Sequence, residues 1–523
     1  MGRAPKWRTY GGLFAIALLV YALESLAWPL SPGRDANLYL TYYAGLGDAH
    51  PVYPELMLFV MPVAPLLFGA LLDIGGANLA ELAMGIAFAG SIVALVAAAS
   101  TVSRRVGLVS AVALLAYTPY GAVFHQVSSD APFACGLALW ALAVLMTVRR
   151  PTLTRFALHG AAVFVLVLIR PSSELLLLPF AVVPLVMPLP LRQRALSLVA
   201  FLGVAAALLA VWSTYNRLRF DDFTVSRTSA AQAPFYHLFV YDKLIDPSNG
   251  PASRDLADAV QRDLLPREPY RSYRIDTARF FDSGSSRMWS DLVSLSDRRW
   301  GWNSDYRHLR SAGFEAIRRH PLAYLRGVAG TARIELGEAY DPPAFRKSRG
   351  HAATGEIVIA GRRVPAPTEG QPIPASRLDW LASTPDASIV PDWTSLRAPR
   401  LRYVHAGAAA RAARIEAQVQ RFDAELPSRD GSSSVASALD AIARLYPRPP
   451  LWLAVGFVAA LWRRGRGLKG PLILCGLALW LWIGTAFVQP PKVQYRIPLD
   501  PILIVFAVAA VLGPRRDGGR PPA

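Results

Sequence analysis

The sequence predicts a polytopic α-helical membrane protein with about ten transmembrane helices and a mainly helical soluble insert. Three observations lead to this fold class. Of the 523 residues, 53% are apolar and only 18% are charged. Many apolar runs have nearly the length that crosses a bilayer, and one long stretch, residues 214–448, contains no such run. This composition excludes a disordered chain, and two cysteines are too few for a disulfide framework or a four-cysteine zinc site.

The first apolar run, residues 11–30, follows a short basic start. A signal peptide has a similar outline, but this run is long and no clean cleavage site precedes Ser31, so we expect an uncleaved anchor with a cytoplasmic N-terminus. Further runs lie at 55–75, 79–101, 106–124, 131–148, 156–169, 174–190, 195–213, 449–462, 470–488 and 498–513. Several of these runs are short for a helix that must cross ~30 Å of hydrocarbon.

Basic residues close alternate loops between these runs. The clusters are Arg104-Arg105, Arg149-Arg150 with Arg155, Arg192 with Arg194, Arg463 to Lys469, and Arg515-Arg516 with Arg520. The positive-inside rule assigns this face to the cytoplasm, which places residues 214–448 outside and the C-terminus inside. The net charge of +18 is therefore mainly a topology signal, and we expect no nucleic-acid partner.

The N-terminus and Arg104 are both expected in the cytoplasm, so an even number of crossings must lie between them. Three apolar runs lie there, and one of them must therefore stay on the outer side without crossing. The run 55–75 is the weakest helix because it carries or follows three prolines, Pro54, Pro62 and Pro65. We expect it to pack in or along the outer leaflet of a plasma membrane without crossing. Ten crossings then remain.

The expected domains are an N-terminal membrane domain (1–213, with a first extracytoplasmic loop at 31–54), an extracytoplasmic soluble domain (214–448), and C-terminal membrane helices with a cytoplasmic tail (449–523). In the soluble domain, apolar periodicity predicts helices at 252–264, 306–320, 321–338, 400–425 and 434–446. The stretch 340–399 is rich in turn formers and is expected to be loops, with a hairpin over Glu356–Val364 that turns at Ala360-Gly361.

Ionisable and aromatic residues gather at the predicted outer ends of spans. They are Asp35, Asp48 and His50 in the first loop, Asp130 before a middle span, Arg170 between two short spans, and Lys492, Tyr495 and Arg496 before the last span. Each has an ordinary structural explanation as a helix cap, a loop ion pair or an interfacial side chain. Their convergence on one face from distant parts of the sequence nevertheless indicates a site.

These elements together resemble the GT-C superfamily of membrane glycosyltransferases, in the bacterial family 39/83-like branch that contains protein O-mannosyltransferases and the lipid A aminoarabinose transferase. The matching elements are Asp35, Ser128-Ser129-Asp130 with Phe133, Arg170-Pro171, Tyr495-Arg496 with Pro498, and the segment Glu315–Tyr324. Two elements depart from the family pattern: Ala36 stands where a glutamate is frequent, and a His-Pro-Pro-Leu stretch is blurred into His50–Pro54.

The resemblance implies a GT-C-like fold and an inverting transfer of a sugar from a polyprenyl-phosphate-linked donor to an extracytoplasmic glycan, lipid or protein. It implies Asp35 as the catalytic base. The donor phosphate is assigned to Arg170, Arg496, Lys492 and Tyr495, and auxiliary or acceptor roles are assigned to Asp130, Asp48 and His50. Asp48 and His50 with Asp35 around a divalent cation remain an open alternative, so metal dependence is undecided.

Three other functions compete with this interpretation. A coupled transporter usually buries ionisable groups near the bilayer midplane, whereas only Glu24 and His159 lie inside the apolar runs beyond the first or last three residues of each run. A lipid-linked polysaccharide ligase or polymerase would share the lipid phosphate chemistry. A non-catalytic scaffold would use residues 214–448 as a binding module and would not depend on Asp35.

Overall fold

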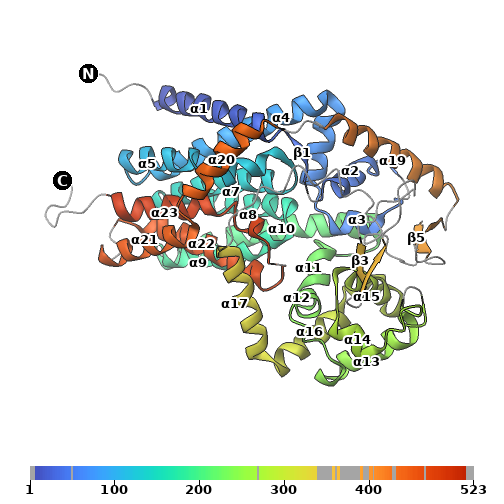
Figure 1. The fold of residues 1–523 in the computed structure, drawn as a ribbon. Helices are drawn as coiled ribbons and strands as arrows, with labels where there is room; N and C mark the ends of the chain where they lie inside the picture. The colour runs from blue at the N-terminus through green and yellow to red at the C-terminus, as the bar shows by residue number, and fades with distance from the viewer. Residues whose placement is uncertain are drawn as a thin grey trace, which may run out of the picture.

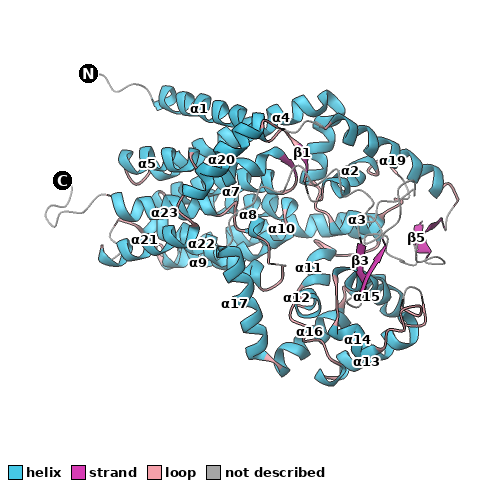
Figure 2. Cartoon of the chain, viewed as in Figure 1, coloured by secondary structure: helices cyan, strands magenta, loops and turns pink. Residues whose placement is uncertain are grey.

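The computed structural model describes residues 6–33, 35–48, 51–267, 270–337, 356–359, 362–365, 389–392, 400–403, 406–426, 431–463, 467–489 and 491–513. Helices dominate these residues, and the few strands are short (Figure 2). A bundle of apolar helices forms one part of the molecule, and a lobe of shorter helices lies beside one end of it (Figure 1).

The bundle contains α1 (Lys6–Ala27), α4 (Val63–Ser100), α5 (Arg104–Leu115), α7 (Asp130–Arg149), α8 (Leu153–Ile169), α9 (Leu177–Val186), α10 (Leu191–Phe220), α21 (Pro449–Trp462), α22 (Lys469–Ala486) and α23 (Asp500–Leu512). Among the described residues, five helices are long and apolar enough to cross a membrane: α1, α4, α7, α10 and α22. A bent pair that starts with α5 would make a sixth, while α8, α9 and α23 are shorter apolar helices. The count of about ten crossings therefore stays a prediction.

The predicted boundary between the runs 55–75 and 79–101 coincides with a break in the helical backbone at Gly75 and Gly76. A short helix, α3 (Pro54–Phe59), is followed by α4, whose 38 residues include most of both runs. The chain kinks inside α4 at Gly75 and Gly76, and Gly76 has φ +64°, a conformation that favours glycine. The part of α4 before the kink is roughly 18 Å long, so the expectation that it does not cross stays a prediction.

The run 106–124 is also broken in the structure. It forms α5, α6 (Thr118–Ala122) and the 3₁₀ turn η1 (Val123–His125), with a bend of 62°. Pro119 lies in the first turn of α6, where proline is compatible with a helix start but not with its continuation from α5. The bend brings the following residues back across the end of the bundle.

The basic cluster between α21 and α22 contacts the ends of two other helices of the bundle. Arg463 donates to the carbonyl of Ala510 at 2.8 Å, and Lys469 donates to the carbonyl of Val186 at 3.0 Å. The first bond joins the end of α21 to α23, and the second joins the start of α22 to the end of α9. The assignment of this face to the cytoplasm rests on the charge pattern and remains a prediction.

The lobe is built by the first half of the predicted soluble domain and has its own apolar core. It contains α11 (Arg227–Gln232), α12 (Phe235–Val240), η3 (Pro247–Asn249), α13 (Pro251–Ala259), the π turn η4 (Val260–Leu264), α14 (Thr277–Asp282), α15 (Ser286–Trp300), η5 (Trp302–Ser304), α16 (Arg307–Arg319) and α17 (Pro321–Gly337). The helices predicted at 252–264, 306–320 and 321–338 are confirmed as α13 with η4, α16 and α17.

The second half of the predicted soluble domain lies on the bundle. In α19 (Ala408–Glu425), Ile415, Val419 and Phe422 are buried in the core of the bundle. Just before α20 (Ser433–Leu445), the Ser432 amide donates to the Leu26 carbonyl at the end of α1 at 2.6 Å. Residues 214–448 thus supply two structural parts, the lobe and a pair of helices that cover the bundle.

The β structure in this region corrects one helix boundary and confirms a hairpin. The strands β3 (Glu356–Ile359) and β4 (Arg362–Pro365) pair antiparallel in the predicted hairpin register, and the turn residues lie outside the described residues. The helix expected over 400–425 begins only at Ala408, because β6 (Arg400–Tyr403) pairs with β5 (Ile389–Asp392).

Candidate functional site

A short parallel bridge brings two distant loops together at the lobe end of the bundle. In it, β1 (Ser31–Pro32) pairs with β2 (Gln126–Val127). Gly33 follows the bridge, and a Cβ at this position would lie 2.7 Å from the Val127 carbonyl oxygen, so only glycine fits without movement. The bridge therefore fixes the start of the first loop against the loop that leads into α7.

Asp35 follows directly and precedes the short helix α2 (Ala36–Ala44). Asp35 occupies the N-cap position of α2, but its side chain makes no capping hydrogen bond. The capping role considered for Asp35 is therefore not observed. The alternative partner Arg34 lies outside the described residues.

Asp35 lines a cavity of about 680 Å³ between the bundle and the lobe. Three other predicted site residues, Arg170, Lys492 and Tyr495, line the same cavity. Lys492 and Tyr495 lie on the loop and 3₁₀ turn η6 (Val493–Tyr495) between α22 and α23, and Arg170 ends α8. A carboxylate and two basic side chains from three separate parts of the chain thus line one cavity.

Arg170 is held in place by Ser129, Asp130 and Phe133, which belong to another element of the family resemblance. It forms an ion pair with Asp130, and its Nε donates to Ser129 Oγ at 3.3 Å. Its guanidinium carbon lies 4.8 Å from the Phe133 ring centroid and 6.0 Å from the Tyr495 ring centroid. Asp130 does not line the cavity, so in this structure its contact with the site runs through Arg170.

Arg496 is separated from the other predicted phosphate-binding residues. It is only 2% exposed, does not line the cavity, and pairs with Asp500, with Nε–Oδ1 at 3.1 Å. Asp500 also accepts a 2.5 Å hydrogen bond from Tyr117. The structure therefore does not place Arg496 beside Lys492 in the cavity, contrary to the prediction. The carboxylate of Asp500, four residues later, holds the Arg496 guanidinium in the protein interior.

Asp48 also lies away from the cavity. It is 5% exposed, its carboxylate pairs with Arg414 of α19, and its backbone carbonyl accepts from Arg219. His50 lies outside the described residues. Within the part of the chain that the structure describes, no three His, Cys, Asp or Glu side chains are grouped as metal ligands. The alternative of a cation between Asp35, Asp48 and His50 therefore gains no support.

The lobe side of the cavity was not predicted residue by residue. It is lined by uncharged polar and aromatic side chains: Thr228, Ser229, Gln232, Tyr236, Ser286, Trp289 and Ser290. The Tyr236 and Ser286 hydroxyls are 2.9 Å apart, and Gln489 Nε2 donates to Gln232 Oε1 at 3.1 Å. Glu174, four residues after Arg170, lines the bundle side.

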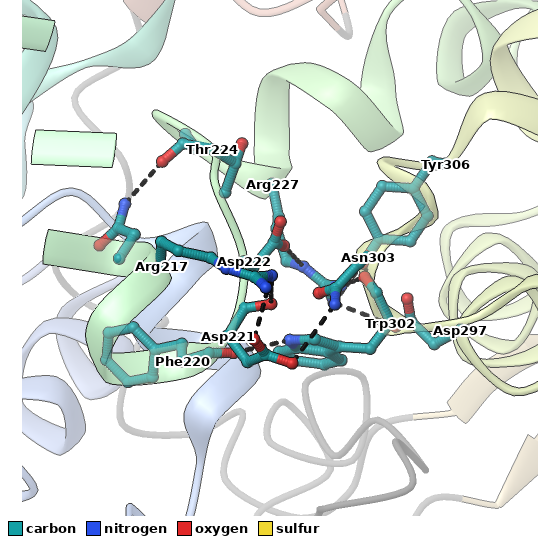
Figure 3. A network of polar contacts seen from close by, with 12 residues as sticks. Arg217, Phe220, Asp221, Asp222, Thr224, Arg227, Asp297, Trp302, Asn303 and Tyr306 are labelled. Atoms are coloured by element: carbon teal, nitrogen blue, oxygen red, sulfur yellow. Dashed lines mark hydrogen bonds and ion pairs between the residues drawn. The ribbon is translucent and has the colours of Figure 1, made fainter. Parts of the chain in front are cut away.

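A buried polar network fixes the lobe wall to the end of α10 (Figure 3). Arg227, at the start of α11, is 1% exposed and pairs with Asp222 at 2.7 Å and with Asp297 at 3.2 Å. It also donates to the Tyr306 hydroxyl at 2.8 Å and stacks on the Trp302 ring, with its guanidinium carbon 3.4 Å from the ring centroid.

The network combines high charge with full burial. Burial raises the pKa of the Asp297 carboxyl above its usual range, and the Arg227 guanidinium opposes that shift. Thr228, the residue after Arg227, lines the cavity and donates to the Phe59 carbonyl at 2.6 Å. The network therefore sets the position of the cavity wall.

Comparison with known proteins gives few relatives. No family model matches the chain, and no curated protein matches it. The chain is similar to solved structures of ArnT. ArnT from Cupriavidus metallidurans bound to undecaprenyl phosphate is 14% identical over 98% of this chain and 78% of that chain, with a TM-score of 0.32. The apo state of the same ArnT is 13% identical over 97% and 78%, with a TM-score of 0.30.

ArnT is the lipid A aminoarabinose transferase, a protein of GT-C fold, and it belongs to the branch that the sequence motifs resemble. The identity and TM-score are low. The assignment of individual site residues in this chain accordingly rests on its own geometry.

Proposed function

We propose that this protein is a membrane glycosyltransferase that moves a sugar from a polyprenyl-phosphate-linked donor to a hydroxyl group of an extracytoplasmic acceptor. The observation that carries the proposal is the cavity that joins Asp35, Arg170 and Lys492 at the boundary between an apolar bundle and a soluble lobe. A lipid phosphate must lie at such a boundary because its polyprenyl chain stays in hydrocarbon.

The basic side chains suit the donor phosphate. Arg170 carries five N–H donors, so it can keep its bond to Asp130 and still bind a phosphate oxygen. Lys492 adds a second positive charge and Tyr495 adds a hydroxyl donor in the same cavity. We assign these three residues to the phosphate and Asp130 to the orientation of Arg170.

Apolar residues on one side of the cavity suit the lipid chain. Leu178 of α9 and Trp480 of α22 line the cavity and are also 64% and 44% exposed on the bundle surface. The Trp480 indole N–H donates to the Leu175 carbonyl at 2.9 Å, which joins α22 to the 3₁₀ turn Pro171–Leu176 just before α9. We propose that the polyprenyl chain leaves the cavity along this surface.

Asp35 is proposed as the general base of an inverting transfer. The acceptor oxygen attacks C1 of the sugar, the bond from C1 to the phosphate oxygen breaks, and Asp35 takes the acceptor proton. The polyprenyl phosphate leaves with both bonding electrons, and Arg170 and Lys492 stabilise its growing negative charge. No acid is required for the leaving group, because a phosphate is already a weak base.

The lobe is proposed to select the acceptor. Its cavity wall is uncharged, and hydroxyl and amide side chains beside Trp289 suit a carbohydrate or another neutral hydroxyl-bearing acceptor. In this scheme residues 214–448 are extracytoplasmic, both termini are cytoplasmic, and the protein is a multi-pass protein of the cell membrane. Arg496 is given a positioning role in the loop that carries Lys492.

The test compares Asp35→Asn with Asp73→Asn in lipid nanodiscs that contain a defined polyprenyl-phosphate sugar. Asp73 is a matched control because it lies outside this cavity and pairs with Arg421. Asp35→Asn keeps the side-chain shape and removes the proton acceptor, so turnover should fall roughly 10²–10⁴-fold while donor binding persists. Full activity of Asp35→Asn would refute the assignment of the base.

Lipid analysis of cells that lack the protein separates the proposal from its nearest rival. A polyprenyl-phosphate monosaccharide should accumulate. Accumulation of a lipid-linked oligosaccharide would instead indicate a polysaccharide ligase or polymerase, and an unchanged lipid pool would favour a transporter or scaffold.

A further inference from the structure

The helix α17 has two opposite faces of different character. Tyr324, Val328, Thr331 and Glu335 form a buried stripe with helical spacing. On the opposite face, Leu322 is 73% and Leu325 is 51% exposed, and Arg326 and Arg333 are exposed beside them. We call these four residues the outer face of α17. All residues of the helix are described, and its only acidic side chain, Glu335, is buried.

The buried stripe joins α17 to the cavity end of α22. Glu335 Oε2 accepts a 2.9 Å hydrogen bond from the Trp482 indole. The Tyr324 hydroxyl donates to the Phe487 carbonyl at 3.1 Å, and the two rings lie 5.9 Å apart. At the other end, Arg448 donates to the Gly337 carbonyl at 3.2 Å. The bundle therefore holds α17 along its length.

The helix α17 lies where the bundle meets the lobe (Figure 1). Figure 1 shows α17 running crosswise to α21, α22 and α23, from the bundle to α16 of the lobe. On α22, the apolar side chains Trp480 and Ile483 are each 44% exposed, as expected of a helix surface that faces acyl chains.

We propose that the outer face of α17 lies on the bilayer, in the leaflet on the cavity side, and binds lipid headgroups. A helix with leucines and arginines on one face is typical of segments that lie in the interface plane. Leu322 and Leu325 enter the headgroup and acyl boundary. Arg326 and Arg333 reach the lipid phosphates, whose charge is complementary to theirs.

This contact would set the height of the lobe above the membrane. Tyr324 and Val328 belong to the core of the lobe, so a fixed α17 also fixes the cavity wall that the lobe supplies. A lipid phosphate has a fixed depth in the bilayer, and the wall must meet it at that depth.

Fluorescent labelling tests the proposal in the full-length protein. The two native cysteines, Cys135 and Cys475, are replaced by alanine, and Leu325→Cys is labelled with a small fluorophore in nanodiscs whose lipids carry a nitroxide at the headgroup. Asp258→Cys on the exposed side of α13 is the matched control. The label at 325 should lose fluorescence to the nitroxide lipid and the label at 258 should not.

Equal, unquenched fluorescence at both positions would overturn the proposal and would leave a protein as the remaining occupant of this face. Leu322→Cys repeats the measurement if the first variant does not yield a monodisperse protein. The two arginines are tested with R326Q/R333Q in bilayers that contain phosphatidylglycerol. The ratio of quenched to unquenched label at position 325 should fall on the order of tenfold. An unchanged ratio in the variant would show that the arginines do not contribute to the contact.

Discussion

Glu335 offers a direct test of the way α17 is anchored. Its carboxyl is fully buried against Trp482, and burial raises its pKa from a usual 4.5 to about 7. Hydrogen bonds from Trp482 and from the Lys492 backbone amide, and the charge of Arg496, act in the opposite direction but do not cancel the burial. We therefore examine the substitution Glu335→Gln, which keeps the shape and an acceptor oxygen but cannot ionise.

The sign follows from proton binding. Between pH 4.5 and 7 the folded protein keeps a proton on Glu335 that the unfolded chain has lost, so the free energy of unfolding falls as pH rises through this window. A difference of about 2.5 pKa units at ~1.4 kcal/mol per unit gives a total loss of about 3 kcal/mol. The Glu335→Gln variant should not show this loss of stability. Its free energy of unfolding should therefore rise relative to that of the wild type as pH increases.

The assay is the thermal unfolding of purified protein between pH 5 and pH 8, which covers most of that change. Glu315→Gln is the control. Burial opposes the charge of Glu315, but hydrogen bonds from the amides of Ala252 and Ser253 outweigh it and lower the pKa. The contribution of the Glu315 carboxylate to stability is constant above pH 5. The curve of melting temperature against pH for Glu315→Gln should therefore run parallel to the wild-type curve. A Glu335→Gln curve that is also parallel would refute the reasoning.

Three further outcomes are expected. Lys492→Ala should raise the KM for the lipid donor more than it lowers kcat, because its charge meets the phosphate already in the ground state, and an unchanged KM would contradict its assignment. Arg227→Met leaves two buried carboxylates unpaired and should cost roughly 3–5 kcal/mol of stability, whereas a normal melting curve would mean that the network is dispensable. A cysteine at Asp282 should react with an impermeant reagent added outside intact cells and one at Arg150 should not, and the reverse pattern would invert the topology.

The sequence predicted the helices well because hydrocarbon imposes a simple length and composition rule on each of them. The boundary that this rule placed after residue 75 is the kink at Gly75 and Gly76, whereas the separation of α3 from α4 inside the run 55–75 was not predicted. Burial of α19 on the bundle was also not predicted. The apolar stripe of α19 indicates that one face of the helix is buried, but it does not indicate which part of the protein covers that face.

The site was predicted in part. Asp35, Arg170 and Lys492 were recognised because they close apolar runs on one face, and the cavity brings them together. Arg496 was grouped with them because it also lies at the predicted outer end of a span and belongs to the Tyr495-Arg496 element of the resemblance. The signal that separates it was present in the sequence, since Asp500 is four residues away and can pair with the guanidinium. The lobe wall carries no motif, and only the fold reveals it.

The assembly of the cavity from distant loops has a consequence for the synthesis of the protein. Its lining runs from Asp35 to Tyr495, and the lobe wall between them cannot close the space without the last loop. Because a chain is made and inserted from its N-terminus, nearly the whole polypeptide must be in the membrane before the site exists. A nascent or truncated chain therefore holds Asp35 and Arg170 without the complete cavity, and under the proposed function it would be unable to use a lipid-linked sugar before the last helices are in place.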